Sequence, residues 1–201
     1  MPASRRTQAE RSADTRDALI AAARTLFATH GYAEVALETI VRDAGMTRGA
    51  LYHHFADKAE LFTAVFERVD SEVNERIGQA IASADQNGPL EVIQLGASMW
   101  LDAAVDPEVQ RIVLVDAPAV LGWERWNEVG NNSNIALVQA LLTHAIDIGA
   151  IPAQPVDATA HTLLGAMSEA ALYITRADDP TQARRDAGMV IERMIRSLAT
   201  A

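Results

Sequence analysis

Cysteine is absent from the 201-residue sequence, which excludes disulfide bonds, thiol nucleophiles and cysteine-ligated zinc. No apolar run approaches the ~20 residues that a membrane-spanning helix needs. The first 16 residues, MPASRRTQAERSADTR, are polar and charged and contain no apolar segment of the kind found in a signal peptide. Together these absences predict a cytoplasmic protein with no membrane partner.

The sequence also lacks the short motifs of common enzymes: the G-x-S-x-G elbow, H-E-x-x-H, the P-loop and the Rossmann glycine pattern. His53 and His54 are adjacent on a predicted helix and point about 100° apart, so they make a poor chelating pair. His144 and Asp147 share a helix face and, with His161, leave a metal site open as an alternative, although such pairs often arise by chance. We predict a protein without catalytic residues, cofactor or metal; a helical enzyme of unrecognised type is the remaining alternative.

Charge is distributed unevenly along the chain. The net charge of −10 at first argues against a nucleic-acid partner. Residues 1–60, however, hold 8 basic and 8 acidic side chains, whereas residues 61–201 hold 9 basic and 19 acidic ones. The acidity therefore lies outside the N-terminal segment, which is compatible with a DNA-binding head on an acidic body.

Apolar residues in the N-terminal part follow helical spacing, and no alternating strand pattern or internal repeat is found. Gly31 and Gly45 are predicted helix stops in the left-handed conformation. Asp57 and Glu60 have the spacing of a capping box, in which an acceptor is followed three residues later by Glu. The predicted segments are a flexible arm over 1–12, helices over 14–30, 37–44 and 47–54, and a long helix over 57–81.

The C-terminal part is predicted to be helical as well, which makes the fold class all-α. Asn87-Gly88-Pro89 is expected to break the chain, Pro118 to interrupt it, and Gly130-Asn131-Asn132 to interrupt or bend a helix. Gly149 is a further predicted stop. The predicted helices cover 90–104, 107–116, 120–128, 135–148, 155–176 and 180–198.

A tight turn over Ala44-Gly45-Met46-Thr47 joins the second and third predicted helices, which is the geometry of a helix-turn-helix. The third helix is short and rich in long donors and aromatics, while Leu51 and Phe55 can anchor its inner face. A polar surface of no special function is the alternative for the same side chains. The pattern predicts that this helix is presented outward to DNA.

The run GYAEVALETIVRDAGMTRGALYHHFADKAELF strongly resembles the DNA-binding domain of the TetR family of regulators. Leu19, Ala22, Ala23, Leu26 and Phe27, upstream of this run, also fit the first helix of the family, so the resemblance covers about 45 residues. It implies a three-helix helix-turn-helix domain with an N-terminal arm over 1–60, and a helical effector-binding and dimerisation domain over 61–201. The matching positions are Gly31, Tyr32, Ile40, Ala44, Gly45, Thr47, Arg48, Gly49, Leu51, Tyr52, His54, Phe55, Lys58 and Leu61.

The resemblance also implies which residues contact double-stranded DNA. Arginine suits guanine edges, whereas lysine, tyrosine and histidine suit phosphate oxygens. The predicted DNA-binding residues are Thr47, Arg48, Gly49, Tyr52, His53, His54 and Lys58. The sequence departs from the family where a Ser or Thr usually caps the second helix, because Val35-Ala36 stand there, and Thr39 is an uncertain substitute.

The body is expected to bind a small, apolar or aromatic effector and to form a homodimer on a palindromic operator. For each pocket candidate, plain core packing is the alternative, and the apolar stripes of the last two helices could instead pack within one subunit. Asn131, Asn132 and Asn134 are either ligand donors or part of a loop. The pocket candidates are Met99, Trp100, Trp123, Trp126, Met167 and Tyr173, and the interface candidates are Leu163, Met167, Ala170, Ile174, Ile191, Met194, Ile195 and Leu198.

These features predict a repressor that an effector releases from its operator. A transcriptional activator would use the same parts. A DNA-binding protein that does not switch would share the N-terminal head and need no cavity.

Overall fold

The computed structural model describes residues 8–84 and 88–199, with the side chains of 129–133 outside that description. Every regular element in these ranges is helical, in agreement with the predicted all-α class. In chain order the helices are α1 (Gln8–His30), α2 (Leu37–Asp43), α3 (Arg48–His54), α4 (Lys58–Ser83), α5 (Pro89–Ala103), α6 (Pro107–Val109), the π-helix η1 (Gln110–Asp116), α7 (Ala117–Leu121), α8 (Trp123–Asp147), α9 (Val156–Arg176) and α10 (Pro180–Ser197).

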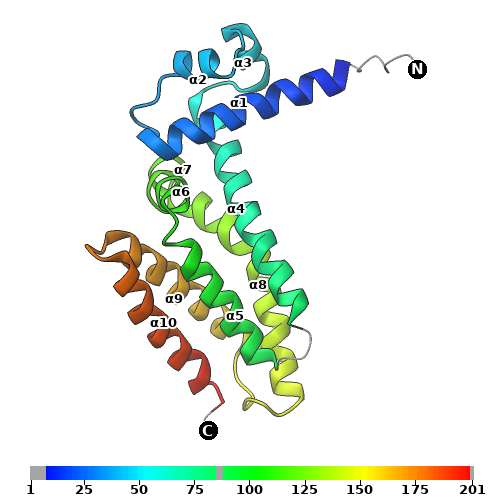
Figure 1. The fold of residues 1–201 in the computed structure, drawn as a ribbon. Helices are drawn as coiled ribbons and strands as arrows, with labels where there is room; N and C mark the ends of the chain where they lie inside the picture. Colours follow the sequence, from blue (N-terminus) through cyan, green and yellow to red (C-terminus); the bar gives the residue numbers. More distant parts are fainter. Residues whose placement is uncertain (1–7, 85–87, 200–201) are drawn as a thin grey trace.

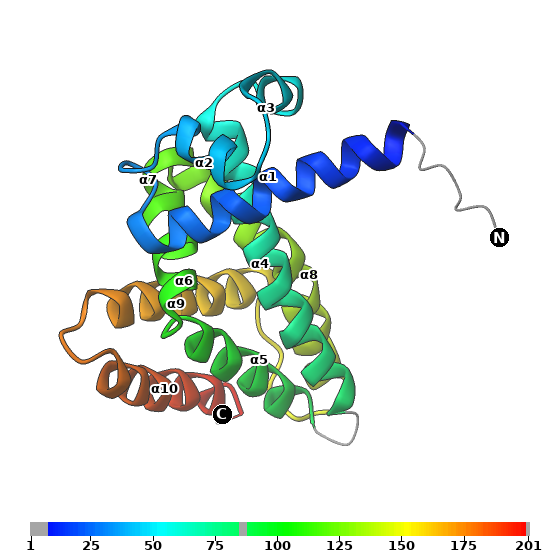
Figure 2. The same cartoon turned by 45° about the horizontal axis from the view of Figure 1, so that its top comes forward.

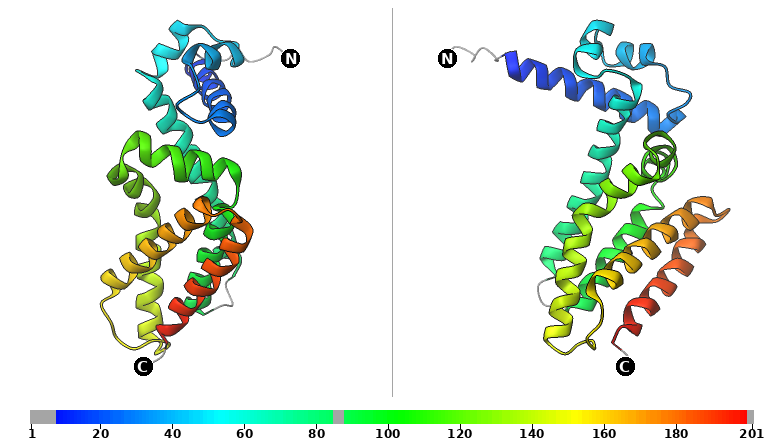
Figure 3. Two further views of the ribbon diagram at one scale, coloured as in Figure 1. Left: turned by 90° about the vertical axis from the view of Figure 1, so that its left-hand side faces the viewer. Right: turned by 180° about the vertical axis from the view of Figure 1, so that it is seen from behind.

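The chain is divided into a head and a body, which α4 connects (Figure 1). Helices α1, α2 and α3 form the head, and α1 lies across the start of α4. The long α4 descends from the head into the body, where it packs against α5. Helices α9 and α10 lie side by side on the outside of the body, with α10 also against α5 (Figures 2 and 3). One rigid element therefore extends from the head deep into the body.

The head is held together by apolar side chains that pack against the start of α4. Phe27 of α1 and Phe62 of α4 are fully buried, with ring centroids 5.3 Å apart, and Tyr32 packs against both. Leu51 of α3 is also fully buried, which fixes the inner face of this helix as predicted. The polar side of α3 is consequently directed outward.

Local caps define where α3 and α4 begin. The hydroxyl of Thr47 accepts a hydrogen bond from the amide of Ala50 at 3.1 Å, and Asp57 accepts one from the amide of Glu60 at 2.8 Å. The Glu60 carboxylate accepts from the amide of Ala56 at 2.6 Å, so the predicted capping box is present with its return bond one residue earlier. The left-handed glycines predicted at the helix ends are also confirmed, at Gly31 and Gly45 among others.

Helix α2 lacks such a cap, as its sequence predicted. Ala36 holds the extended conformation of an N-cap, with φ −87° and ψ 145°, but no side chain bonds to the first turn. We expect Ala36→Ser to stabilise the protein by about 1 kcal/mol, because its hydroxyl can reach an unpaired amide of that turn. Thermal unfolding should show a rise in Tm of about 2–4 °C. Ala21→Ser, at an exposed position inside α1, is the control, and an equal gain there would contradict the capping explanation.

Helix α1 begins earlier than predicted. Helix α1 starts at Gln8, so residues 8–12 are helical and the prediction of a flexible arm over 1–12 is wrong for them; residues 1–7 lie outside the described chain. The segment QAERSADTR contains no glycine or proline that would stop a helix from extending backward.

Pro118 was predicted to interrupt the helical chain, but the chain remains helical there. Residues 110–116 form a π-helix, in which the amide of Ala117 donates to the carbonyl of Ile112 five residues earlier. Pro118 then falls in the first turn of α7, where a missing N–H costs little. In a π-helix the carbonyl of Val113 would accept a hydrogen bond from the backbone N–H of residue 118, but Pro118 has no N–H. The Val113 carbonyl instead accepts a hydrogen bond from the indole N–H of Trp126 at 2.7 Å.

The predicted break near Gly130 is also absent. The backbone is helical from Trp123 to Asp147, so the two predicted helices are one, and the break lies at Gly122 with φ +80°. Helix α8 packs against α5, α7 and α9, and its backbone is helical through the Gly130-Asn131-Asn132 segment. No helix within the described ranges is both long and apolar enough to cross a membrane.

Candidate nucleic-acid interface and effector cavity

The outward face of α3 presents the residues that were predicted to contact DNA. Thr47, Arg48, Gly49, Tyr52 and His53 are exposed, with Tyr52 45% accessible, whereas His54 is half-buried. These residues lie on or next to α3, a helix that packs against α1 and α2 in the head (Figure 1). Arginine, tyrosine and histidine side chains on this surface can donate hydrogen bonds to a nucleic acid.

Arg48 is oriented by two neighbours in the absence of DNA. Its Nη1 lies 3.0 Å from the carboxylate of Glu38 on α2, and its Nη2 lies 3.4 Å from the hydroxyl of Tyr52. The guanidinium carbon is 5.5 Å from the centroid of the Tyr52 ring. Because Arg48 and Glu38 are each more than 60% exposed, this ion pair is weak and can be exchanged for phosphate or base contacts.

Lys58, the only lysine of the chain, is more enclosed than its predicted role as a phosphate contact suggests. Its Nζ lies 4.3 Å from the centroid of the Tyr32 ring and 3.4 Å from the carbonyl oxygen of Ala33. Burial lowers the pKa of Lys58, while Glu34 and Asp116 act in the opposite direction. Its charge lies at the start of α4, between the head and the body.

Two sets of contacts join the head to the body. The Arg24 guanidinium of α1 bonds to Glu72 of α4 at 2.8 Å and to Glu108 of α6 at 2.7 Å. The backbone N–H of Tyr32 donates to the carboxylate of Asp116 at 2.7 Å. Asp116 is the last residue of η1, so a displacement of this π-helix would act directly on the end of α1 and the loop that follows it.

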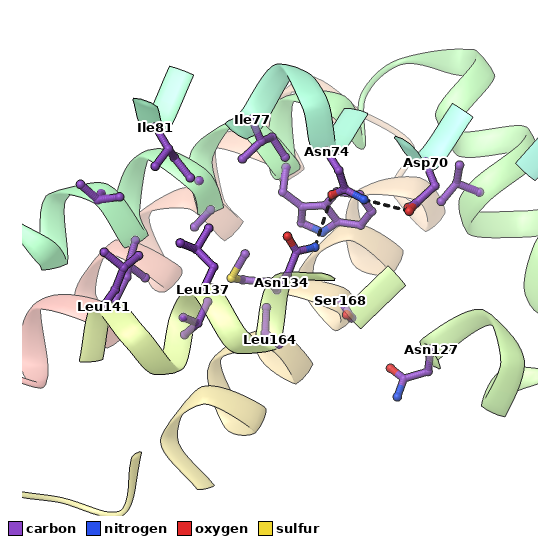
Figure 4. Close-up of a pocket in the computed structure, with 18 of the residues that line it drawn as sticks. Asp70, Asn74, Ile77, Ile81, Asn127, Asn134, Leu137, Leu141, Leu164 and Ser168 are labelled. Atoms are coloured by element: carbon purple, nitrogen blue, oxygen red, sulfur yellow. Dashed lines mark hydrogen bonds between the residues drawn. The ribbon is translucent and has the colours of Figure 1, made fainter. Parts of the chain in front are cut away.

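The body contains a cavity of about 80 Å³ between α4, α5, α8 and α9, with Val113 of η1 in its wall (Figure 4). Its lining is mostly aliphatic, and the indoles of Trp100 and Trp126 contribute aromatic surface. Five polar side chains interrupt this apolar lining. They are Asp70, Asn74, Asn127, Asn134 and Ser168.

Three of the polar side chains form a hydrogen-bonded chain. Asn134 donates through Nδ2 to the Oδ1 of Asn74 at 3.3 Å, and Asn74 donates through its own Nδ2 to the Oδ2 of Asp70 at 2.8 Å. Only 5% of Asp70 is exposed. Burial raises the pKa of this carboxyl to about 6, and the hydrogen bond from Asn74 lowers it only in part. A carboxylate is thus held inside a cavity whose lining is mostly aliphatic and aromatic.

The chain matches two families that together cover most of its length. The family described as "Bacterial regulatory proteins, tetR family" matches residues 19–65, and "Tetracyclin repressor-like, C-terminal domain" matches residues 90–198. The chain belongs to the TetR family. It is a TetR-family DNA-binding transcriptional regulator, and residues 31–62, where the sequence resemblance was found, lie within the first match.

Individual relatives agree with this assignment. The TetR-family chain is 36% identical over 109 residues to the transcriptional repressor BepR of Brucella suis, a match that spans 54% of this chain and 51% of BepR. A crystal structure of a TetR-family regulator from Pectobacterium atrosepticum is 34% identical, covers 98% of this chain and 99% of its own, and has a TM-score of 0.83. FadR of Bacillus subtilis, solved in complex with stearoyl-CoA, is 18% identical with a TM-score of 0.70, covers 92% of this chain and 97% of its own, and shows a shared fold alone.

Half of the predicted pocket residues of this TetR-family chain lie at the cavity. Trp100, Trp126 and Met167 line it. Trp123 and Tyr173 are more than half exposed and, like Met99, are not part of its lining. The ring of Trp123 instead packs against that of Trp126, with centroids 4.8 Å apart.

The carboxylate of the cavity was not predicted from the sequence. Asp70 occupies the same helical stripe of α4 as Phe66, Val73 and Ile77, at spacings of four, three and four residues. An acidic residue within an apolar stripe is the available signal. Asn134, which was proposed as a ligand donor, does line the cavity, and the side chains of Asn131 and Asn132 fall outside the described structure.

The predicted interface residues are mostly inside the protomer. Ile174 and Ile195 are at most 1% exposed, and Leu163 and Ile191 at most 5%, so these four form part of the core of one chain. Met167 lines the cavity. Ala170, Met194 and Leu198 are half-buried. The large exposed apolar side chains of α9 and α10 are Tyr173, Met189 and Val190.

The His144, Asp147 and His161 alternative is not supported by the geometry. Within the described residues, no three histidine, aspartate or glutamate side chains are grouped as a metal site would require. His161 instead lies 3.6 Å from the Asp157 carboxylate on the same helix.

Proposed function

We propose that this TetR-family regulator is a homodimeric repressor that holds a palindromic operator through α3 and is released by a small-molecule effector. The observation that carries the proposal is that α4 and η1 connect the head, which bears the Arg48–Tyr52 surface, with the cavity in the body. The protein acts in the cytoplasm, where operator DNA is found, and performs no catalysis.

The exposed face of α3 supports the DNA-binding half of the proposal. In a dimer, two such helices enter successive major grooves when they are about 34–36 Å apart. Arg48 would exchange Glu38 for DNA, with Tyr52, His53 and His54 beside it, and Thr47 and Gly49 at the start of the helix. Lys58 would contribute positive charge near the DNA backbone, although its contact with Tyr32 restricts how far its side chain can reach.

The small size of the cavity supports the second half of the proposal, in which an effector releases the protein from its operator. Binding sites for small molecules typically enclose about 300–1,000 Å³, so an effector must move α4, α5 and α8 apart to enter the 80 Å³ cavity. Displacement of Trp126 or Val113 would move η1, whose Asp116 holds the backbone of Tyr32 in the head. An effector that binds the displaced arrangement better lowers operator affinity by that difference in binding free energy.

Exposed apolar side chains support a dimer through α9 and α10. Met189 and Val190 are each more than half exposed on α10, as is Tyr173 on α9. We propose this outer face as the interface, with Ala170, Met194 and Leu198 at its margin, while the buried Leu163, Ile174, Ile191 and Ile195 support it from within. This replaces the predicted contact through the buried stripe, because a core side chain cannot reach a second subunit.

Val190→Asp is expected to raise the dimer dissociation constant at least 10-fold, because a carboxylate would be buried without a partner. Light scattering after size exclusion, at decreasing protein concentration, measures the change. Val115→Asp is the matched control, since Val115 is 44% exposed on η1 away from this face. An unchanged dimer in the Val190 variant would contradict an interface on α10.

Selection of bound duplexes from random DNA tests the proposed function. We expect a palindrome whose half-sites are about one helical turn apart, bound with an affinity that falls steeply with salt. Adding effector candidates to the same complexes tests release. Selection of a site without two-fold symmetry would overturn the dimeric arrangement, and a bound operator that no cavity ligand releases would favour a regulator that does not switch.

A further inference from the structure

The carboxylate of Asp70 is an unusual component of the body core. Among the residues that the structure describes, no arginine, lysine or histidine pairs with it, and one amide, that of Asn74, donates to it. A buried charge is costly unless it is paired and hydrogen-bonded. Folding does not require this charge, because asparagine at the same position could accept the same hydrogen bond.

The neighbouring amides keep Asp70 as an acceptor that faces the cavity. Asn134 donates to the carbonyl oxygen of Asn74, which directs the NH₂ group of Asn74 toward Asp70. In Figure 4, Asp70 and Asn74 come from α4 and Asn134 from α8, and all three line the same cavity. One carboxylate oxygen takes the bond from Asn74, and the other can accept a donor from a molecule in the cavity.

The remaining walls suit a cation that carries an apolar group. Trp126 has already donated its N–H to Val113, so its indole offers a ligand ring surface rather than a hydrogen bond. Trp100 adds a second indole, and the aliphatic lining accommodates an apolar body. Aromatic faces attract cations, and a carboxylate together with indole rings binds an ammonium group better than a neutral or anionic one.

We propose that the cavity binds a lipophilic amine whose protonated nitrogen donates to Asp70 while its apolar portion packs between Trp100 and Trp126. This inference rests on the proposed effector site and specifies its chemical class. The ammonium neutralises the buried carboxylate, and the apolar portion moves the helices apart. A carboxylate ligand of the same size is excluded by repulsion from Asp70.

Three compounds of matched size and different charge test the proposal: phenethylamine, 2-phenylethanol and phenylacetate. Tryptophan fluorescence of the 201-residue protein at pH 7.5 reports binding, because two of the three tryptophans line the cavity. We expect phenethylamine to bind about 10- to 100-fold more tightly than 2-phenylethanol, the range for a hydrogen bond to a charged group, and phenylacetate not to bind.

Asp70→Asn separates the charge from the shape of the site. We expect this variant to bind phenethylamine and 2-phenylethanol equally, while Ser168→Ala, at another polar position of the lining, retains the preference for the amine. Thermal unfolding verifies that both variants are folded. Equal binding of amine and alcohol by the unsubstituted protein, an amine preference that persists in Asp70→Asn, or no amine binding up to millimolar concentration would each overturn the proposal.

Operator binding measured with the same three compounds distinguishes this inference from the proposed function. An amine that binds through Asp70 without releasing DNA would support the amine site and contradict effector-induced release. Release by the neutral alcohol, with no preference for the amine, would support the switch and contradict the assigned ligand class.

Discussion

Asp70→Asn is expected to stabilise the unliganded protein by up to about 3 kcal/mol above pH 7. The native carboxyl has a pKa of about 6 against 3.8 for an unperturbed one, and each pKa unit corresponds to about 1.4 kcal/mol. The origin is burial in the apolar cavity, which disfavours the ionised form. Asparagine removes the charge and can still accept the hydrogen bond from Asn74.

The pH dependence has a definite sign. Because the native pKa of Asp70 is raised, the folded state binds more protons than the unfolded state between about pH 4 and 6. The contribution of Asp70 to stability is therefore lost as pH rises through this window. The difference between Asp70→Asn and the unsubstituted protein should be near zero at pH 4, grow up to about pH 6, and level off above pH 7.

Chemical denaturation at several pH values measures this difference directly, since all other titrating groups cancel between the two proteins. Glu75→Gln, at an exposed position of the same helix, is the control and should show no comparable change. Destabilisation of Asp70→Asn at pH 8 would contradict an unpaired buried carboxylate. Such a result would indicate that the charge has a favourable partner in the folded protein.

Arg48→Ala is expected to weaken operator binding by about 10- to 100-fold, the range for losing one good contact to a base, while leaving the dimer intact. Arg48 is the only arginine of α3 and is exposed next to Tyr52. If the contact is to a base, specificity at one operator position is relaxed; if it is to a phosphate, the slope of affinity against salt decreases by about one. Fluorescence anisotropy with the selected operator and with variants of it measures both.

Two further variants make this prediction specific. Arg176→Ala removes an equally exposed arginine from α9, remote from the head, and should leave binding unchanged. Glu38→Gln releases the partner that competes with DNA for Arg48 and should strengthen binding a few-fold. Full affinity in Arg48→Ala would remove this residue from the recognition surface.

Local sequence was sufficient to predict the head because its determinants are local. A cap such as Thr47 or Asp57 acts within three residues, and a glycine stop such as Gly31 acts through its own φ angle. The missing cap at Ala36 was predictable for the same reason. These short-range rules place α2, α3 and α4 within a residue or two of the predicted bounds.

The same rules failed where distant packing acts on the chain. Pro118 and the Gly130-Asn131-Asn132 segment are helix breakers by sequence. The π-turn before Pro118 and the contacts of α8 with three other helices nevertheless keep both segments helical. Tertiary contacts override local preference when they contribute more free energy than the local penalty costs.

The sequence by itself determined the all-α class, the helix-turn-helix and its Arg48–Tyr52 surface, because helical periodicity and caps are properties of neighbouring residues. Only the tertiary structure decided that Asp70 is a cavity carboxylate, that Trp123 is outside the cavity, and that Ile174 belongs to the core of one chain. The physical reason is that burial depends on which helix packs against which. A stripe such as that of α4 specifies an inward face without specifying whether a neighbour fills it or leaves room for a ligand.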